Sequence, residues 1–255
     1  MRLSIPLTMI VLGLPAAAAL AAMSAAPATP AYVTTALNDP ARKDDAADDV
    51  RRQAAAVMTF SEVKPGQKVV ELAPGGGYWT HIFSDIVGPQ GHVYALWPNE
   101  MAKFDAKSIA KWQDLVKAPP YNNVSVLQEP AATLTVAEPA DLVFTVQNYH
   151  DYHDSFMGPV DMASFDKQVF NELKPGGFFV VIDHVANAGD TTATEKLHRI
   201  DPEVVKKEVE GAGFVLDGSS DALKNPADEH KVKVFDPSIR GKTDQFILRF
   251  KKPVH

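Results

Sequence analysis

The sequence contains no cysteine. Disulfide bonds, thiolate metal ligands, cysteine nucleophiles and lipid attachment through an N-terminal cysteine are therefore all excluded. If the protein is exported, its fold must be held by its core alone, without the cross-links common in exported proteins.

Basic residues are outnumbered: 25 Lys and Arg stand against 32 Asp and Glu, which gives a formal net charge of -7. No cluster of Lys or Arg interrupts this balance, and a protein that neutralises many phosphates needs such clusters. We therefore expect no nucleic-acid partner. The chain of 255 residues, 45% hydrophobic and 22% charged, is long enough for one large α/β domain.

Residues 1–31 differ from the rest of the chain. A positive charge at Arg2 precedes an apolar run over residues 3–22, and small residues follow up to residue 31. This order is typical of a secretory signal peptide, so we expect the protein to be periplasmic or secreted and, after cleavage, not to be stably inserted in a membrane. The alternative is an uncleaved anchor, because about 20 apolar residues span a bilayer. Pro6 and Pro15 argue against that alternative.

Residues 32–44 show no apolar period and include an Asn-Asp-Pro turn signal, which predicts a linker. From Asp45 onward, apolar residues at helical spacing predict a helix with charges on its other face. We interpret these charges as a solvated face. The alternative is that Arg51 or Arg52 covers a ligand site from the N-terminal side. Residues 45–255 are predicted to form the single domain.

The motif that carries most information lies at residues 68–80. Two valines suit a buried parallel strand that ends at Glu71, and three consecutive glycines, Gly75 to Gly77, permit a sharp reversal of the chain. Apolar residues at i, i+3, i+4 and i+7 then predict a helix that ends at Gly88. Because a helix N-terminus points at the glycines, the pattern indicates a nucleotide-binding turn.

Short β-type runs alternate with helical patterns beyond this turn, which predicts a parallel sheet. The last two strands are separated by a polar loop without a helix, so they are expected to pair antiparallel. The predicted strands after the first are residues 92–96, 123–127, 142–146, 177–182, 213–216 and 245–250.

Several short segments occur in an order that points to one protein class: Pro74–Tyr78, Asn148–Asp151, Asp183-His184, His198–Asp201 and Arg240–Thr243. From about residue 45 to its end the chain resembles the class I S-adenosylmethionine-dependent methyltransferases. Within that class it is similar to a group of predicted bacterial methyltransferases, many with export signals. The resemblance implies a Rossmann-like α/β fold, with a seven-stranded, mostly parallel sheet, helices on both faces and an antiparallel last strand. It also implies S-adenosylmethionine as cofactor.

The resemblance assigns the methionine part of the cofactor to the glycine motif, in which the Glu71 carboxylate offsets the ammonium and sulfonium charges. Ala73 replaces the usual first glycine, which is acceptable if its φ is negative. The cofactor-binding residues implied here are Glu71, Ala73, Gly75, Gly76, Gly77 and Tyr78.

Further cofactor contacts are implied at the ends of later strands. Trp97 stands where the class usually has an acid that binds the ribose hydroxyls, so we expect Trp97 to pack against the ribose or adenine, and Glu100 or Asn99 to substitute for the acid. Glu129 corresponds to a position near the adenine amino group, and Gln147 begins the loop after the fourth strand. The alternatives are that Trp97 simply packs in the core and that Glu129 is a surface acid.

The polar loop of residues 147–154 follows the fourth strand, and ligands bind at that edge of such sheets. We expect His150 to act as general base, because its unperturbed pKa of about 6.5 suits neutral pH. Asp151 would orient it and Tyr149 would shape the pocket. No metal is expected; the alternative is that Asp151, Asp183 and a neighbouring His hold a divalent ion.

Two remaining segments have open interpretations. His198 and Arg199 are read as surface charge, or alternatively as a substrate-anion site, and residues 240–243 as a hairpin loop or a substrate clamp. The hypothesis for the whole chain is a methyltransferase with a small-molecule methyl acceptor. The alternative is a non-catalytic small-ligand-binding protein of the same fold. A dinucleotide-dependent oxidoreductase is a third class, disfavoured by the missing acid at Trp97.

Overall fold

The computed structural model describes residues 28–254, so the predicted signal peptide lies almost entirely outside the described residues. No helix within residues 28–254 is long and apolar enough to cross a membrane. The α-helices are α1 (Ala31–Leu37), α2 (Ala54–Ser61), α3 (Tyr78–Val87), α4 (Ala102–Leu115), α5 (Met162–Glu172), α6 (Ala193–Leu197) and α7 (Pro202–Gly211). The strands are β1 (Lys68–Leu72), β2 (His92–Pro98), β3 (Val124–Glu129), β4 (Ala140–Val146), β5 (Leu173–His184), β6 (Val215–Ser220) and β7 (Gln245–Lys251).

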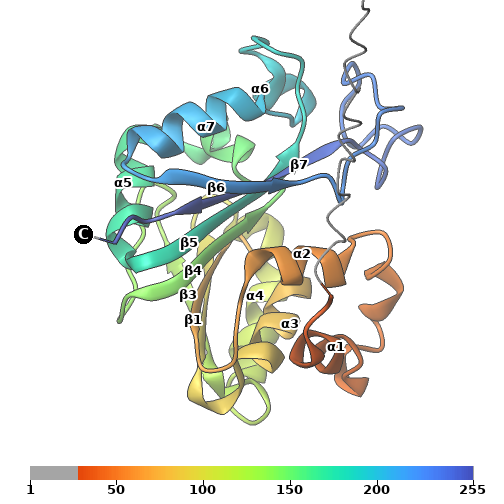
Figure 1. Cartoon of the computed structure of the whole chain (residues 1–255). Helices are drawn as coiled ribbons and strands as arrows, with labels where there is room; N and C mark the ends of the chain where they lie inside the picture. Colours follow the sequence, from red (N-terminus) through yellow and green to blue (C-terminus); the bar gives the residue numbers. More distant parts are fainter. Residues whose placement is uncertain (1–27, 255) are drawn as a thin grey trace, which may run out of the picture.

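The seven strands form one sheet in the order β3-β2-β1-β4-β5-β7-β6 (Figure 1). The pairs β1/β2, β1/β4, β2/β3 and β4/β5 are parallel, and β7 is antiparallel to both β5 and β6. The predicted fold class is confirmed. The strand order reverses between β1 and β4, and ligands of open α/β sheets bind at the carboxyl ends of strands at such a point.

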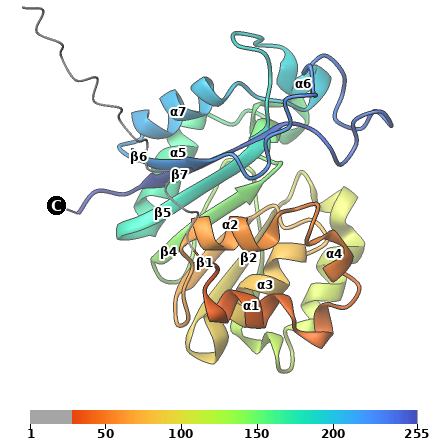
Figure 2. The same cartoon turned by 45° about the vertical axis from the view of Figure 1, so that its right-hand side comes forward.

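Two apolar cores lie on the two faces of the sheet, because successive side chains of a strand point to opposite faces. In β1, Val69 belongs to the core that includes α1 to α4, whereas Val70 belongs to the core that includes α5 and α7. Figures 1 and 2 show α1 to α4 below the sheet and α5 to α7 above it. Glu71, next in β1, therefore points to the side of α3.

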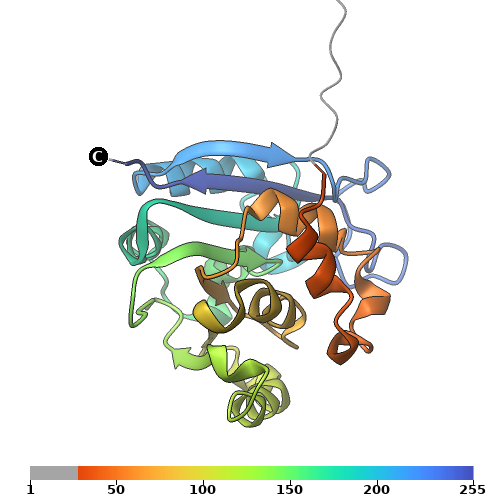
Figure 3. The same ribbon diagram turned by 60° about the horizontal axis from the view of Figure 1, so that its bottom comes forward.

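The β6 and β7 pair forms one edge of the sheet (Figure 3). Residues 221–244 connect these strands without an α-helix, as expected from their polar sequence. Figures 1 and 3 show this connection at the same end of the molecule as the segment that precedes α2. The contact is direct at Gly241, where an added Cβ would lie 3.4 Å from Cδ of Arg51.

The expectation of a linker over residues 32–44 is wrong. α1 occupies half of this range and buries Val33 and Ala36 against the α2 and α3 side of the core. Arg42 is fully buried. Its charge is compensated there, because it pairs with Asp49 at 2.7 Å and donates to the backbone oxygen of Leu37 at 2.9 Å. A stripe of two apolar residues is too short to give a readable period, so the sequence did not reveal this helix.

The predicted helix from Asp45 also begins later than expected. The chain forms a short 3-10 helix, η2 (Ala46–Asp48), and α2 begins only at Ala54. Gln53, with φ of 49°, interrupts the helix before α2, and Val50, one of the apolar residues at helical spacing, is 81% exposed instead of buried. The residues from 45 to 53 instead form a covering segment beside the glycine turn.

Candidate active site

The glycine turn after β1 follows an unusual backbone path. Ala73, Gly75 and Gly77 have φ of 48°, 55° and 86°. The condition of a negative φ at Ala73 is not met: this alanine adopts the left-handed conformation, which costs a residue with a Cβ about 1–2 kcal/mol. Its amide donates to the Leu96 oxygen at 2.8 Å, and its own oxygen accepts from Asn148 Nδ2 at 3.1 Å. These two bonds keep the turn in place.

The three glycines differ in what surrounds them. A Cβ added at Gly75 or Gly76 would meet no heavy atom within 4 Å, so these residues leave open space. A Cβ at Gly77 would lie 1.9 Å from Nε1 of Trp112 in α4. Gly75 and Gly76 therefore provide a cradle for a ligand, whereas Gly77 permits close packing between the turn and α4.

A cavity of about 350 Å³, here called the first cavity, opens above this cradle. Its size is within the range of small-molecule sites. Glu71, Arg52 and Gln147 bring polar groups to it from β1, the covering segment and the loop after β4. The lining residues are Asp45, Asp48, Arg52, Glu71, Leu72, Ala73, Pro74, Gly75, Gly76, Tyr78, Trp79, Phe144, Val146, Gln147 and Asn148.

Glu71 is buried, and Thr80 Oγ1 of α3 donates to its Oε2 at 2.6 Å. Burial raises the pKa of Glu71 to about 8, while the Thr80 hydroxyl and the charge of Arg52 act in the opposite direction. A cation that enters the cavity would favour the ionised form of this carboxyl group and would be attracted to its negative charge. The site is therefore suited to a positively charged ligand.

The covering segment is fixed to α3 through Tyr78. The Tyr78 hydroxyl donates to Asp49, which also pairs with Arg42, and the guanidinium of Arg52 lies 4.5 Å from the centre of the Tyr78 ring. Arg52 thus lines the first cavity from the N-terminal side, which was the alternative interpretation of its charge. Neither Asp49 nor Arg42 was identified from the sequence, because only the tertiary structure brings residues 42–52 over the turn.

A second cavity of about 410 Å³ lies beside the first, and Gln147 lines both. Gln147 has φ of 61°, and its side-chain amide donates to Gln245 Oε1 at 2.9 Å. Left-handed backbone in a residue with a side chain is concentrated at functional sites. The lining residues of the second cavity are Arg51, Gln147, His184, Val234, Phe235, Arg240, Gly241 and Thr243.

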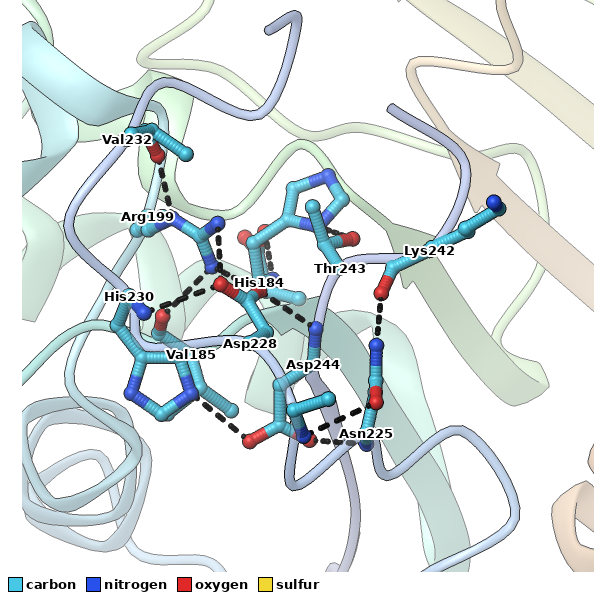
Figure 4. A network of polar contacts seen from close by, with 12 residues as sticks. His184, Val185, Arg199, Asn225, Asp228, His230, Val232, Lys242, Thr243 and Asp244 are labelled. Atoms are coloured by element: carbon cyan, nitrogen blue, oxygen red, sulfur yellow. Dashed lines mark hydrogen bonds and ion pairs between the residues drawn. The ribbon is translucent and has the colours of Figure 1, made fainter. Parts of the chain in front are cut away.

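One wall of the second cavity is the loop of residues 221–244, which a buried polar network holds in place (Figure 4). Arg199 is fully buried: its Nη1 pairs with Asp228 Oδ2 at 2.9 Å, and it donates to the backbone oxygens of Val232 and Val185. Neither interpretation of Arg199 from the sequence holds, because its charge is neutralised inside the protein. Its position two residues before Asp201, which caps α7, gave no signal of a partner 29 residues away.

His184 links this loop to the sheet. Its Nδ1 lies 2.7 Å from Thr243 Oγ1, and burial lowers the pKa of His184 to about 4. His184 is therefore a neutral imidazole at the wall of the second cavity. Arg240 and Thr243 line the same cavity, which is compatible with the substrate-clamp interpretation of residues 240–243.

His150 lies in a short 3-10 helix, η5 (His150–His153), and contacts carboxylates on two sides. Its Nδ1 is 2.8 Å from Asp183 Oδ1, and its Nε2 is 3.2 Å from Asp151 Oδ1. Burial alone would lower the pKa of His150, but these carboxylates outweigh it and raise the pKa to about 10. His150 lines neither of the two cavities, and a raised pKa makes it a poorer proton acceptor at neutral pH, so the structure does not support its assignment as general base.

Tyr149 is also placed differently from the expectation. It is fully buried, and its hydroxyl contacts Asp166 Oδ2 at 2.8 Å and Glu208 Oε2 at 3.1 Å, on the face of the sheet that carries α5 and α7. Burial, together with these carboxyl groups, raises the pKa of Tyr149 well above its usual value. Tyr149 lines neither cavity, so its role is to anchor the loop after β4.

Three expected cofactor contacts also lie elsewhere. Trp97 is fully buried in the core under α3 and α4, as its alternative interpretation had it, because β2 points this position to that face. Glu100 accepts from the amide of Ala131, and Glu129 accepts from the amide of Thr135. None of the three lines the first cavity. The structure does bring Glu71, Ala73, Gly75, Gly76, Tyr78 and Gln147 together around it.

Comparisons with known proteins agree with this architecture. Over 73 residues the chain is 35% identical to a protein-L-isoaspartate O-methyltransferase of Ignicoccus hospitalis, covering 29% of this chain and 32% of that protein. The chain spans 19% to 46% of the length of the curated relatives it matches.

Solved structures share the fold at low sequence identity. A SAM-dependent methyltransferase from Aquifex aeolicus has a TM-score of 0.53 and 18% identity, with 86% of this chain and 96% of that chain covered. Aeropyrum pernix fibrillarin, with natively bound S-adenosyl-L-methionine, has a TM-score of 0.51 and 15% identity, with 79% and 76% covered.

A family model matches residues 48–193, which is more than half of the chain and includes the glycine turn, Gln147 and the loop that follows it. The sheet order, the open glycine cradle and this match agree with one another. The chain belongs to the ubiE/COQ5 methyltransferase family.

Proposed function

We propose that this protein transfers a methyl group from S-adenosylmethionine, bound in the first cavity, to a small molecule in the second. The residues fit the cofactor: Gly75 and Gly76 leave the backbone open, and Glu71, Asp45 and Asp48 bring carboxyl groups to a ligand with a net positive charge. When bound, the cofactor supplies a methyl group on a positively charged sulfur.

The observation that carries the proposal is the meeting of the two cavities at Gln147. Methyl transfer gains most of its rate from holding two reactants in contact, and two adjoining cavities provide that arrangement. The second cavity supplies Arg51 and Arg240 for anionic or polar groups, and Phe235 for an apolar part of the acceptor. Its volume of about 410 Å³ suits a small molecule.

The chain contributes positioning more than proton transfer in this proposal. Asp183 and Asp151 raise the pKa of His150, whereas burial lowers the pKa of His184, which is neutral and lies at the wall of the acceptor cavity. His184 can therefore accept or donate a hydrogen bond to the acceptor, with Thr243 fixing its ring. Gln147, held by Gln245, borders both cavities at the place where they meet.

Calorimetric titration with S-adenosylhomocysteine tests the cofactor assignment. We expect a single site per chain, and the absence of binding at millimolar ligand would reject the proposal.

Incubation with methyl-labelled S-adenosylmethionine and fractionated cell extract tests the acceptor class. Label should appear in the small-molecule fraction. Label in protein or RNA would contradict the small acceptor, and binding without any transfer would indicate a ligand-binding protein.

We also propose that residues 1–31 direct export, so that the protein is periplasmic or secreted. The support is the order of one basic residue, an apolar run and small residues. Fusion of residues 1–35 to a reporter that is active only outside the cytoplasm tests this. An inactive reporter with normal expression would place the protein inside the cell.

A further inference from the structure

A cluster of three potential metal ligands lies outside the first cavity. It consists of His150 Nε2, Asp151 Oδ1 and His198 Nδ1, which all lie within 4.8 Å of one another. The two ring nitrogens are 3.3 Å apart, and Asp151 Oδ1 is 3.2 Å from the His150 nitrogen and 3.6 Å from the His198 nitrogen. The loop after β4 and the end of α6 bring these residues together from positions 48 residues apart.

These separations match those around a bound ion. Zinc–nitrogen and zinc–oxygen bonds of about 2.0–2.2 Å at tetrahedral angles place neighbouring ligand atoms about 3.3–3.6 Å apart. We propose that His150, Asp151 and His198 bind one divalent transition-metal ion, with Zn²⁺ as the representative case. Two imidazoles and one carboxylate favour such ions over Mg²⁺ or Ca²⁺, which prefer oxygen ligands.

Asp183 provides the outer support that metal-bound histidines usually have. One of its oxygens is 2.8 Å from His150 Nδ1, and the other accepts the His150 backbone amide at 2.9 Å. With Nδ1 occupied by this carboxylate, Nε2 is directed to the cluster. The carboxylates of Asp183 and Asp151 also bring negative charge to the place where the cation would bind.

The cluster is open on one side. The side chain of His198 is 21% exposed, whereas those of His150 and Asp151 are 3% and 9% exposed. His198 also contacts Phe235, with ring centres 5.0 Å apart, and Phe235 lines the second cavity. The ion would therefore lie beside the proposed acceptor cavity, reachable from solvent through His198, although its binding does not depend on the proposed methyl transfer.

Titration of the EDTA-treated full chain with Zn²⁺, followed by calorimetry, tests the site without S-adenosylmethionine. We expect one ion per chain. Loss of an outer-shell carboxylate costs about 10- to 100-fold in metal affinity, so Asp183→Asn should weaken binding by that factor, and His198→Ala or Asp151→Asn by more. Titration with Co²⁺ should give the visible absorption of a low-symmetry site in the wild type and not in His198→Ala.

His153→Ala is the matched control. His153 lies in the same 3-10 helix as His150, its side chain has the same 21% exposure as that of His198, and it contacts a carboxylate outside the cluster, that of Glu208. It should keep wild-type affinity. Circular dichroism establishes that each variant is folded. Equal Zn²⁺ affinity in the wild type and His198→Ala would overturn the proposal, as would a wild type that binds no ion.

Discussion

Gly75 and Gly77 share a positive φ, yet one faces open space and the other faces Trp112. Gly77→Ala places a methyl group against the Trp112 ring. Overpacking usually destabilises a protein by about 1–3 kcal/mol and occasionally by more. We expect the loss of stability in this variant to be at the upper end of that range or above it. Gly75→Ala should fold, with a penalty of about 1 kcal/mol for its backbone, and should lose cofactor affinity because its methyl group enters the cavity.

Urea unfolding and S-adenosylhomocysteine titration separate these two effects. Gly189→Ala is the matched control for Gly75→Ala, because Gly189 also has a positive φ, 76°, and open space around an added Cβ, but lines neither cavity. It should show the same loss of stability and unchanged ligand affinity. Unaltered ligand affinity in Gly75→Ala would show that the cradle is not where the cofactor binds.

Glu71 makes stability depend on pH. Its pKa is about 8 in the folded protein and near the ordinary value of 4.5 when unfolded, so the folded state holds an extra proton between these values. Stability therefore falls as pH rises from about 5 to about 8. Urea unfolding across this range should show a decline that is smaller in Glu71→Gln, which keeps an acceptor for Thr80. Parallel profiles for the two proteins would contradict the assignment.

At the scale of elements, the covering segment of residues 45–53 depends on the hydroxyl of Tyr78. Tyr78→Phe keeps the ring beneath Arg52 but removes the hydrogen bond to Asp49. We expect a loss of stability of about 1 kcal/mol, faster amide exchange in residues 45–53, and weaker cofactor binding. Hydrogen-exchange mass spectrometry measures this. Tyr94→Phe, in the opposite core, is the control and should leave exchange in that segment unchanged.

The loop of residues 221–244 depends in the same way on Arg199. Arg199→Ala leaves Asp228 buried without its partner, and breaking a buried pair costs about 3–5 kcal/mol. If the variant folds, S-adenosylhomocysteine should still bind, while the acceptor cavity loses its wall. Lys231→Ala removes a solvent-exposed ion pair with Glu229 in the same loop and should leave the stability nearly unchanged. Similar unfolding midpoints for both variants would argue against Arg199 as the residue that holds this loop in place.

At the scale of the whole molecule, the domain begins before the boundary that the sequence suggested. A chain of residues 45–255 lacks α1 and Arg42, and so exposes the core that Val33 covers. Burying one valine side chain is worth about 1.5–3 kcal/mol, so we expect this chain to be less stable than one of residues 29–255 by at least that amount. Thermal unfolding of the two chains compares them, and equal midpoints would make α1 dispensable.

The sequence alone predicted the fold and the position of the glycine cradle. Alternating apolar runs identified the strands, and the turn chemistry of Gly75 to Gly77 located the cradle, because both are signals between residues close in the chain. The antiparallel pairing of the last strands followed from the polar loop between them. These features depend on local spacing, which a single sequence displays.

Only the tertiary structure decided the state and partners of the polar residues. His150 suits a general base at its ordinary pKa, but Asp183, 33 residues away, binds its Nδ1 and raises its pKa, while its Nε2 lies beside Asp151 and His198. The sequence predicted Trp97 as a ligand contact, but its position in β2 directs its side chain into the core. Burial and charge come from neighbours distant in the chain, and electrostatic energies depend on those distances. The residue types therefore determined which chemistry is available, and the packing determined which residue performs it.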